Sequence, residues 1–290
     1  MATSRERYRT ARDARMAELT GRPTYRRTLG LCTVPGLVVA VIGIFTAPLL
    51  IVVGLVGALA GPLIYYLVLR SQASSAAKDL VMHQWAKEHG WEYQPSPPLP
   101  TDVAFCRDKE RMEAADAFAG QICDVPGLIF NFTYSTFETR TTTDGQGHMT
   151  TYTEEVKHRH TVLRLVVGAV AGVDTVQLAD RGIGFLNKLT AAFGPSRQVE
   201  TESVEFNKRF SLMVNDGADQ GAVLRIFTPA LLVRLINNEF PQTTFQYECG
   251  SLAYVWEDQY DVEDLEEIEG RVASVEPLTA ALRAAVAALH

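Results

Sequence analysis

The stretch LGLCTVPGLVVAVIGIFTAPLLIVVGLVGALAGPLIYYLVL, residues 29–69, decides the architecture of this chain. Its 41 residues include no Asp, Glu, Lys, Arg, His, Asn or Gln. One bilayer crossing takes about 20 apolar residues at about 1.5 Å of rise each, so the length predicts two crossings. Pro48 cannot donate to a continuing helix and disfavours helix at the residue before it. We therefore predict transmembrane helices over residues 29–46 and 49–69.

The flanking charges predict how these helices are oriented. Residues 1–28 carry eight Arg and three acidic residues, Arg70 directly follows the apolar stretch, and no charge separates the two helices. Because positive charge stays on the cytoplasmic side, we expect both termini to be cytoplasmic at a bacterial inner (plasma) membrane. Residues 1–28 then form a basic cytoplasmic tail that can lie on anionic lipid.

The remaining residues have the opposite charge. The chain as a whole has a net charge of −7, which leaves −13 on residues 71–290. This acidity argues against nucleic acid as a partner. The four cysteines form no C-x-x-C pair, so the pattern predicts reduced thiols and excludes a secreted disulfide framework.

Three glycines give the second apolar helix a small-residue stripe. Gly54, Gly57 and Gly61 lie near one face, and Gly57 and Gly61 have the small-xxx-small spacing that lets helix backbones approach closely. The stripe predicts helix packing, either within the hairpin or between copies of the chain.

The soluble part predicts an α+β fold with an antiparallel sheet and a C-terminal helix. Residues 70–100 are expected to form a helix (71–89) and a Pro-rich linker, and residues 101–290 a cytoplasmic domain. Further expected elements are strands over 175–178, 204–214 and 223–227, a helix over 183–193, a helix from Thr228-Pro229, a hairpin over 244–256 that turns at Gly250-Ser251, and a final helix from 262 that Pro277 kinks or restarts.

The strongest strand pattern lies within residues 118–168. Apolar residues alternate from Leu128 to Tyr134, and Asp144–Gly147 is a turn sequence after which a strand returns over 149–167. If Thr143 faces His148, Phe132 opposes Arg159 and one face collects Phe130, Phe132, Leu163 and Leu165 as the core. The Thr-rich tip, residues 139–153, is expected to protrude into solvent.

Few residues indicate a metal site or a catalytic site. His158 and His160 share one face of the returning strand, so they are the candidate metal ligands, but the register places them opposite polar residues and supplies no third ligand. Eight acids within residues 257–269 lack the spacing of an EF-hand and suit a solvated helix entrance. No nucleophile elbow, zincin or Walker motif occurs, so neither a catalytic residue nor a cofactor is predicted.

Four short segments resemble a family. They are residues 90–93 (GWEY), 158–162 (HRHTV), 202–210 (ESVEFNKRF) and 228–231 (TPAL). Together they are similar to a group of uncharacterised membrane-anchored bacterial proteins of actinobacterial type. The resemblance implies a transmembrane hairpin with a cytoplasmic α+β domain and supplies no catalytic residues.

These features predict a membrane-anchored cytoplasmic binding or scaffolding module. Its expected partners are the lipid bilayer and a protein or a second copy of the chain. Two alternatives stay open. One is a membrane-tethered, metal-dependent hydrolase that uses His158 and His160, and the other is an effector whose hairpin oligomerises in the bilayer.

Overall fold

The structure is a computed structural model of the 290-residue chain, and it describes residues 3–46, 48–143, 145, 149–182 and 196–289. The chain divides into two compact units, residues 1–85 with 262–264 and residues 86–261 with 265–290. Each unit is described by itself. The helix expected over residues 183–193 lies outside the described residues.

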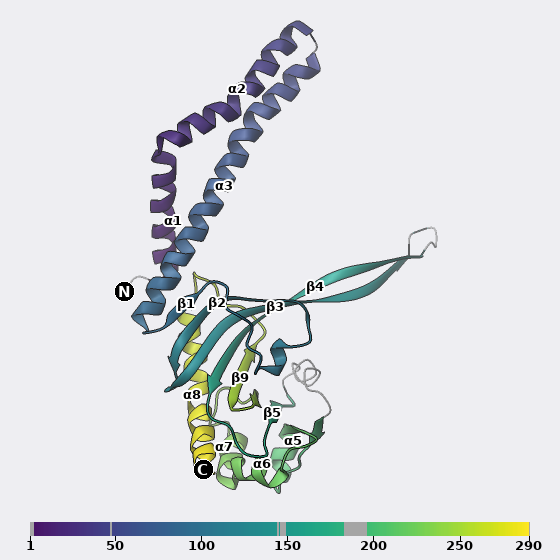
Figure 1. The fold of residues 1–290 in the computed structure, drawn as a ribbon. Helices are drawn as coiled ribbons and strands as arrows, with labels where there is room; N and C mark the ends of the chain where they lie inside the picture. Colours follow the sequence, from purple (N-terminus) through teal and green to yellow (C-terminus); the bar gives the residue numbers. More distant parts are fainter. Residues whose placement is uncertain (1–2, 47, 144, 146–148, 183–195, 290) are drawn as a thin grey trace. The chain divides into compact units, whose positions relative to one another are not determined.

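The first unit is built from three helices, α1 (Ser4–Gly21), α2 (Pro23–Thr46) and α3 (Pro48–Glu88) (Figure 1). α1 begins with a capping box, in which the Thr3 side chain accepts from the Glu6 amide and the Glu6 side chain accepts from the Thr3 amide. α3 runs on past Arg70 to Glu88, so the helix expected over 71–89 is the continuation of the second apolar helix.

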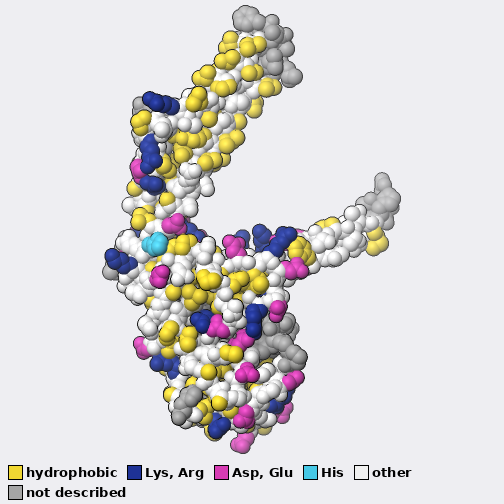
Figure 2. Space-filling model, in the orientation of Figure 1, with side chains coloured by type: hydrophobic (Ala, Val, Ile, Leu, Met, Phe, Trp, Pro, Cys, Tyr) yellow, Lys and Arg dark blue, Asp and Glu magenta, His cyan; other side chains and the backbone are white. Residues whose placement is uncertain are grey.

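The upper parts of α2 and α3 present apolar side chains outward (Figure 2). Leu31 on α2 is 74% exposed, and Leu59 on α3 is 75% exposed. Both helices are long and apolar enough to cross a membrane. A surface of this kind and extent is rare on a protein that is surrounded by water alone.

The second unit contains an antiparallel sheet, which has nine strands in the described part of the chain. The strand order is β1-β2-β3-β4-β9-β8-β5-β7-β6. The α+β class, the antiparallel sheet and the C-terminal helix are confirmed. The strands are β1 (Glu92–Gln94), β2 (Glu110–Ile122), β3 (Val125–Thr143), β4 (Met149–Val166), β5 (Thr175–Asp180), β6 (Ser196–Gln198), β7 (Phe210–Asn215), β8 (Phe245–Glu248) and β9 (Ser251–Trp256).

Both faces of the central strands are buried. One face carries Phe130, Phe132 and Val162, and the residue 99–106 segment packs on it with its short 3-10 helix η1 (Ala104–Cys106). The other face carries Ile129, Leu163 and Tyr254, and the C-terminal helix α8 (Glu266–Ala287) contributes buried apolar residues there. The Tyr254 hydroxyl lies 3.1 Å from that of Thr279 on α8.

The β3–β4 hairpin pairs one residue away from the expected register. Thr143 pairs with Met149, so His160, and not Arg159, lies opposite Phe132. The expected core face of Phe130, Phe132, Leu163 and Leu165 is wrong, because the two phenylalanines and the two leucines lie on opposite faces. All four are fully buried, so alternation of apolar and polar residues could not fix the register here.

One expected strand is helical over its first half, and another is entirely helical. Residues 204–209 form α5 (Val204–Arg209), after which β7 begins at Phe210. The Ser203 side chain caps α5 by accepting from the Phe206 amide, and helix geometry brings Phe206 and Phe210 together with ring centroids 5.1 Å apart. The strand expected over 223–227 is instead α6 (Gln220–Ile226), which Asp219 caps.

The expected helix at Thr228-Pro229, the hairpin and the C-terminal helix are present, with differences in the hairpin turn and in the start of the last helix. α7 (Pro229–Ile236) has Thr228 as its N-cap and Pro229 in its first turn. β8 and β9 form the expected hairpin, but its two-residue turn is Cys249-Gly250 with φ values of 47° and 94°. α8 begins at Glu266 and continues through Pro277 to Ala287, so the proline neither ends nor restarts it.

Candidate functional site

The segment before β2 is held on the sheet by an ion pair and hydrogen bonds. Asp102 accepts from Arg164 on β4 (Nε to Oδ1, 2.8 Å) and from the Ser251 hydroxyl on β9 (2.6 Å). Burial raises the pKa of Asp102, but the bonds from Arg164 and Ser251 outweigh that effect, and the net pKa lies below its ordinary value. The carboxylate therefore stays charged and holds the segment.

Two further contacts fix the end of this segment. The amide of Phe105 donates to Oε1 of Gln246 on β8 at 3.1 Å, and Arg107 pairs with the buried carboxylate of Glu248. These contacts hold Phe105 fully buried on the sheet. They also set the position of Lys109, four residues further on.

Tyr134 on β3 lies at the centre of a group of rings. Its ring stacks on His158, with centroids 4.7 Å apart, and on His160, with centroids 5.6 Å apart. Phe105 meets His160 edge to face at 5.1 Å. Cross-strand pairing explains the arrangement, because His158 lies directly opposite Tyr134 and side chains two residues apart share a face.

Lys109 adds a cation to these rings. Its ammonium nitrogen lies 4.8 Å from the centroid of the Tyr134 ring and 5.3 Å from that of Phe105, which is cation–π distance. Burial lowers the pKa of Lys109, and burial raises the pKa of Tyr134. Partial burial is the main cause of both shifts.

A hollow of about 270 Å³ opens beside Tyr134 and Lys109. Its walls come from the start of β2 and from the part of β3 where the β3–β4 arm leaves the sheet (Figure 1). We call it the Tyr134 site. Its lining combines two aromatic rings, a cation, carboxylates and hydroxyls: Asp108, Lys109, Glu110, Tyr134, Ser135, Thr136 and Phe137. Such a mixture of groups is suited to binding a polar ligand or a peptide segment.

His158 and His160 share a face, as their spacing predicts, but it is an aromatic face and not the expected polar one. Nε2 of His158 lies 2.8 Å from the Thr136 hydroxyl, and Nδ1 of the buried His160 lies 3.2 Å from the Trp256 carbonyl oxygen. Among the described residues, no group of three or more His, Cys, Asp or Glu could hold a metal ion. The two histidines are therefore part of the packing around Tyr134.

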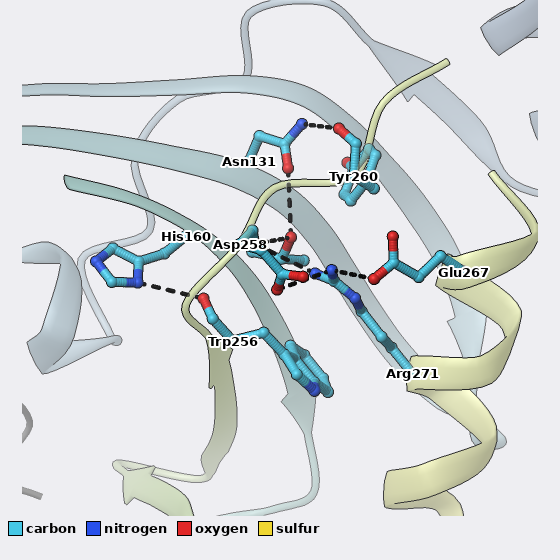
Figure 3. A network of polar contacts seen from close by, with 8 residues as sticks. Asn131, His160, Trp256, Asp258, Tyr260, Glu267 and Arg271 are labelled. Atoms are coloured by element: carbon cyan, nitrogen blue, oxygen red, sulfur yellow. Dashed lines mark hydrogen bonds and ion pairs between the residues drawn. The ribbon is translucent and has the colours of Figure 1, made fainter. Parts of the chain in front are cut away.

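A polar network joins the centre of the sheet to the acidic segment (Figure 3). The Thr161 hydroxyl donates to the Asp258 carbonyl at 2.9 Å, and the Asn131 amide donates to the Tyr260 carbonyl at 2.9 Å. Arg271 on α8 is only 6% exposed. This network fixes the path of the chain between β9 and α8.

Arg271 explains part of the acidic run. Its guanidinium pairs with Glu267 at 2.6 Å and with Asp258 at 2.9 Å, and it lies 5.6 Å from the Trp256 ring centroid. Glu267 is one of three acids in the first turn of α8, where the helix dipole favours negative charge. The acidic segment therefore stabilises the start of α8 and neutralises the buried guanidinium of Arg271.

The glycine stripe contacts α2 unevenly. An added Cβ at Gly54 would lie 2.3 Å from the Ala40 amide nitrogen, and one at Gly61 would lie 3.0 Å from the Cys32 carbonyl oxygen. At Gly57 the nearest atom would be 3.9 Å away, on Gly36. Gly54 therefore lies at the tightest backbone approach of the three.

Sequence reasoning identified none of the residues that line the Tyr134 site, and it also missed Phe105 and Lys109, which pack against the rings around Tyr134. They reach the rings through contacts between residues far apart in sequence, such as that of Phe105 with Gln246. The residue 101–109 segment has no regular alternation that would have revealed this. Only the two-residue spacing of the histidines gave a local signal.

Comparisons with known proteins add little to this geometry. No family model matches the chain, and no curated protein matches it. One solved structure does match, the crystal structure of the mycobacterial trehalose monomycolate transport factor A, TtfA, with 14% sequence identity and a TM-score of 0.38. The match covers 69% of this chain and 93% of that one. Similarity at this level assigns neither a fold nor a function to the chain.

Proposed function

We propose that this chain is a membrane-anchored binding module without catalytic activity. α2 and α3 cross a bacterial inner membrane as a hairpin, and both termini are cytoplasmic. The α+β unit then binds a protein or polar ligand in the cytoplasm through the Tyr134 site. The observation that carries the proposal is the uncharged apolar stretch over residues 29–69, whose helices expose their side chains.

The charges and rings at the ends of the stretch support this orientation. Arg27 precedes it and Arg70 follows it, which favours a cytoplasmic position for both ends. Tyr25 on α2 stacks on Tyr65 on α3, with centroids 5.8 Å apart. Tyrosine rings favour the headgroup depth of a bilayer, so the pair suits the cytoplasmic interface.

The chemistry of the Tyr134 site supports binding rather than catalysis. Lys109 is held against two rings, and the carboxylates of Asp108 and Glu110 line the same hollow. The groups offer cationic, anionic and aromatic contacts side by side, which is the composition of a recognition surface. A peptide segment of mixed charge with an aromatic residue fits this chemistry.

Membrane extraction and thiol labelling test the anchor. We expect the full-length protein to stay in the membrane pellet after alkaline carbonate treatment. A single cysteine placed at Ala2 or at His290, in a chain whose four natural cysteines are serine, should resist an impermeant maleimide in intact cells and react after lysis. Release by carbonate or labelling in intact cells would contradict the proposal.

Lysine labelling tests the binding site. We expect Lys109 to be acetylated more slowly in native membranes than in the purified full-length protein, because a bound partner covers the hollow. Lys157 on β4 is exposed and does not line the hollow, so its labelling provides the internal control. Equal labelling of Lys109 in the two samples would rule out an occupied Tyr134 site in the membrane.

A further inference from the structure

A hollow of about 250 Å³ lies between α1 and α3 in the first unit. Two guanidinium groups, a phenol hydroxyl and one carboxylate line it, together with two apolar side chains. The lining residues are Arg12, Asp13, Met16, Tyr66, Arg70 and Ala73. Arg70 supports the proposed membrane orientation through its charge, but none of these residues belongs to the Tyr134 site or to the polar network of the second unit.

The positive charge in this hollow is only partly neutralised. Arg12 bonds the carboxylate of Asp13, with Nη2 and Oδ1 3.1 Å apart, but Asp13 is 71% exposed and an ion pair in water is weak. Within the described part of the chain, Arg70 is exposed and has neither an ion pair nor a hydrogen bond. One guanidinium is therefore free for a ligand, and the other can exchange a weak partner for a stronger one.

The position of the hollow along α3 determines which ligand it can meet. Arg70 is the first charged residue after the apolar stretch, and Tyr66 lies one helical turn before it. If α3 crosses the membrane, this is the depth of the lipid headgroups. Figure 2 shows further basic side chains over α1 and the start of α2, which would raise the local concentration of anionic lipid.

We infer that this hollow binds the phosphate group of an anionic phospholipid in the cytoplasmic leaflet. Arg12 and Arg70 donate to the phosphate oxygens, and the Tyr66 hydroxyl is placed to donate a third bond. Guanidinium is suited to this task because its planar donors match the geometry of a phosphate. Asp13 opposes binding, since its carboxylate competes for Arg12. The inference rests on the proposed membrane anchor.

The test measures lipid retention by the full-length protein. The protein is purified in detergent with mixed lipid, and retained phosphatidylglycerol and phosphatidylcholine are counted by native mass spectrometry. Binding of inorganic phosphate to the same samples is measured by calorimetry. We expect R12Q/R70Q to lower the retained ratio of phosphatidylglycerol to phosphatidylcholine by about thirtyfold, the effect of two arginine–headgroup contacts.

Two further variants separate a site from bulk charge. R9Q removes one charge from the same helix outside the hollow and should lower the ratio by at most about fivefold, the effect of one basic residue near anionic lipid. D13N leaves the arginines in place and removes their competitor, so it should raise the ratio. Helix content by circular dichroism confirms that each variant is folded.

Several results would overturn the inference that the hollow binds a phospholipid phosphate. An unchanged ratio in R12Q/R70Q overturns it, and so does a fall in R9Q as large as that in R12Q/R70Q or a ratio that does not rise in D13N. Phosphate binding that depends on Arg12 and Arg70, with no preference for phosphatidylglycerol, would assign the hollow to a free phosphate and also overturn it. Carbonate extraction is run in parallel. If the protein stays in the membrane and the variants leave the ratio unaffected, only this inference is wrong. If carbonate releases the protein, the proposed membrane anchor is wrong.

Discussion

At the scale of single residues, Arg271 connects α8 to the chain that follows β9. Replacing it with Ala removes its ion pairs with Glu267 and Asp258 and its bond to the Asp258 carbonyl. Both acids are partly exposed and can regain water, so we expect a loss of about 2 kcal/mol in unfolding free energy. Urea denaturation measures it.

Arg234 provides the matched control for this substitution. It pairs with Glu239 at 2.7 Å, but both side chains are 44% exposed. Arg234→Ala should therefore cost less than about 1 kcal/mol. Equal losses in the two variants would show that Arg271 contributes no more than a surface ion pair.

Asp102 gives the domain a defined pH dependence. Its folded pKa lies below the ordinary value of 3.8, so its contribution to stability is fully present above about pH 4 and is lost as the pH falls through the folded pKa. Asp102→Asn should lower the unfolding free energy at pH 7, and the difference from wild type should shrink below pH 4. A difference that stays constant from pH 7 to pH 3 would contradict this linkage.

At the scale of elements, the glycines of α3 give a matched pair. Gly54→Ala places a methyl group against the α2 backbone and should push the helices apart. Gly57→Ala meets only ordinary contacts, so it should leave the helix spacing unchanged and strengthen the helix by up to about 1 kcal/mol. The measurement is the distance between spin labels at Val38 and Leu55 in lipid, with the natural cysteines replaced. A spacing that does not respond to Gly54→Ala would refute the close approach.

The elements also show what sequence could predict. Alternation identified β3, the turn sequence after it identified β4 as a returning strand, and the Thr228-Pro229 cap identified α7. The predicted register of β3 with β4 was wrong because both faces of these strands are buried, so alternation did not mark one face as the core. α5 was missed because its Val and Phe favour strands, whereas the cap at Ser203 and the packing of Phe206 favour the helix.

The candidate site was predictable only in part. The spacing of His158 and His160 correctly placed them on one face. Their environment depends on Phe105 and Lys109, which tertiary contacts bring to Tyr134 from a segment without periodicity. Contacts of that kind leave no local pattern in a sequence.

At the scale of the whole molecule, the two units should differ in solvent preference. Residues 71–290 contain the whole second unit together with residues 71–85 and 262–264 of the first unit, and they carry a net charge of −13. We expect this fragment to be soluble without detergent and to unfold cooperatively, because the sheet has its own buried core on each face. Size-exclusion chromatography and thermal circular dichroism measure both properties. Aggregation of the fragment would show that its fold requires the first unit.

The β3–β4 arm has a consequence for how the chain could be divided. β3 and β4 are neighbours at the middle of the sheet, and their pairing runs from Gly127 and Leu165 out to Thr143 and Met149. A nick in the arm would leave one fragment ending in β3 and another beginning with β4. The backbone pairing between β3 and β4 would still join the two fragments. Two separately synthesised pieces could therefore reassemble by complementation, as split proteins do.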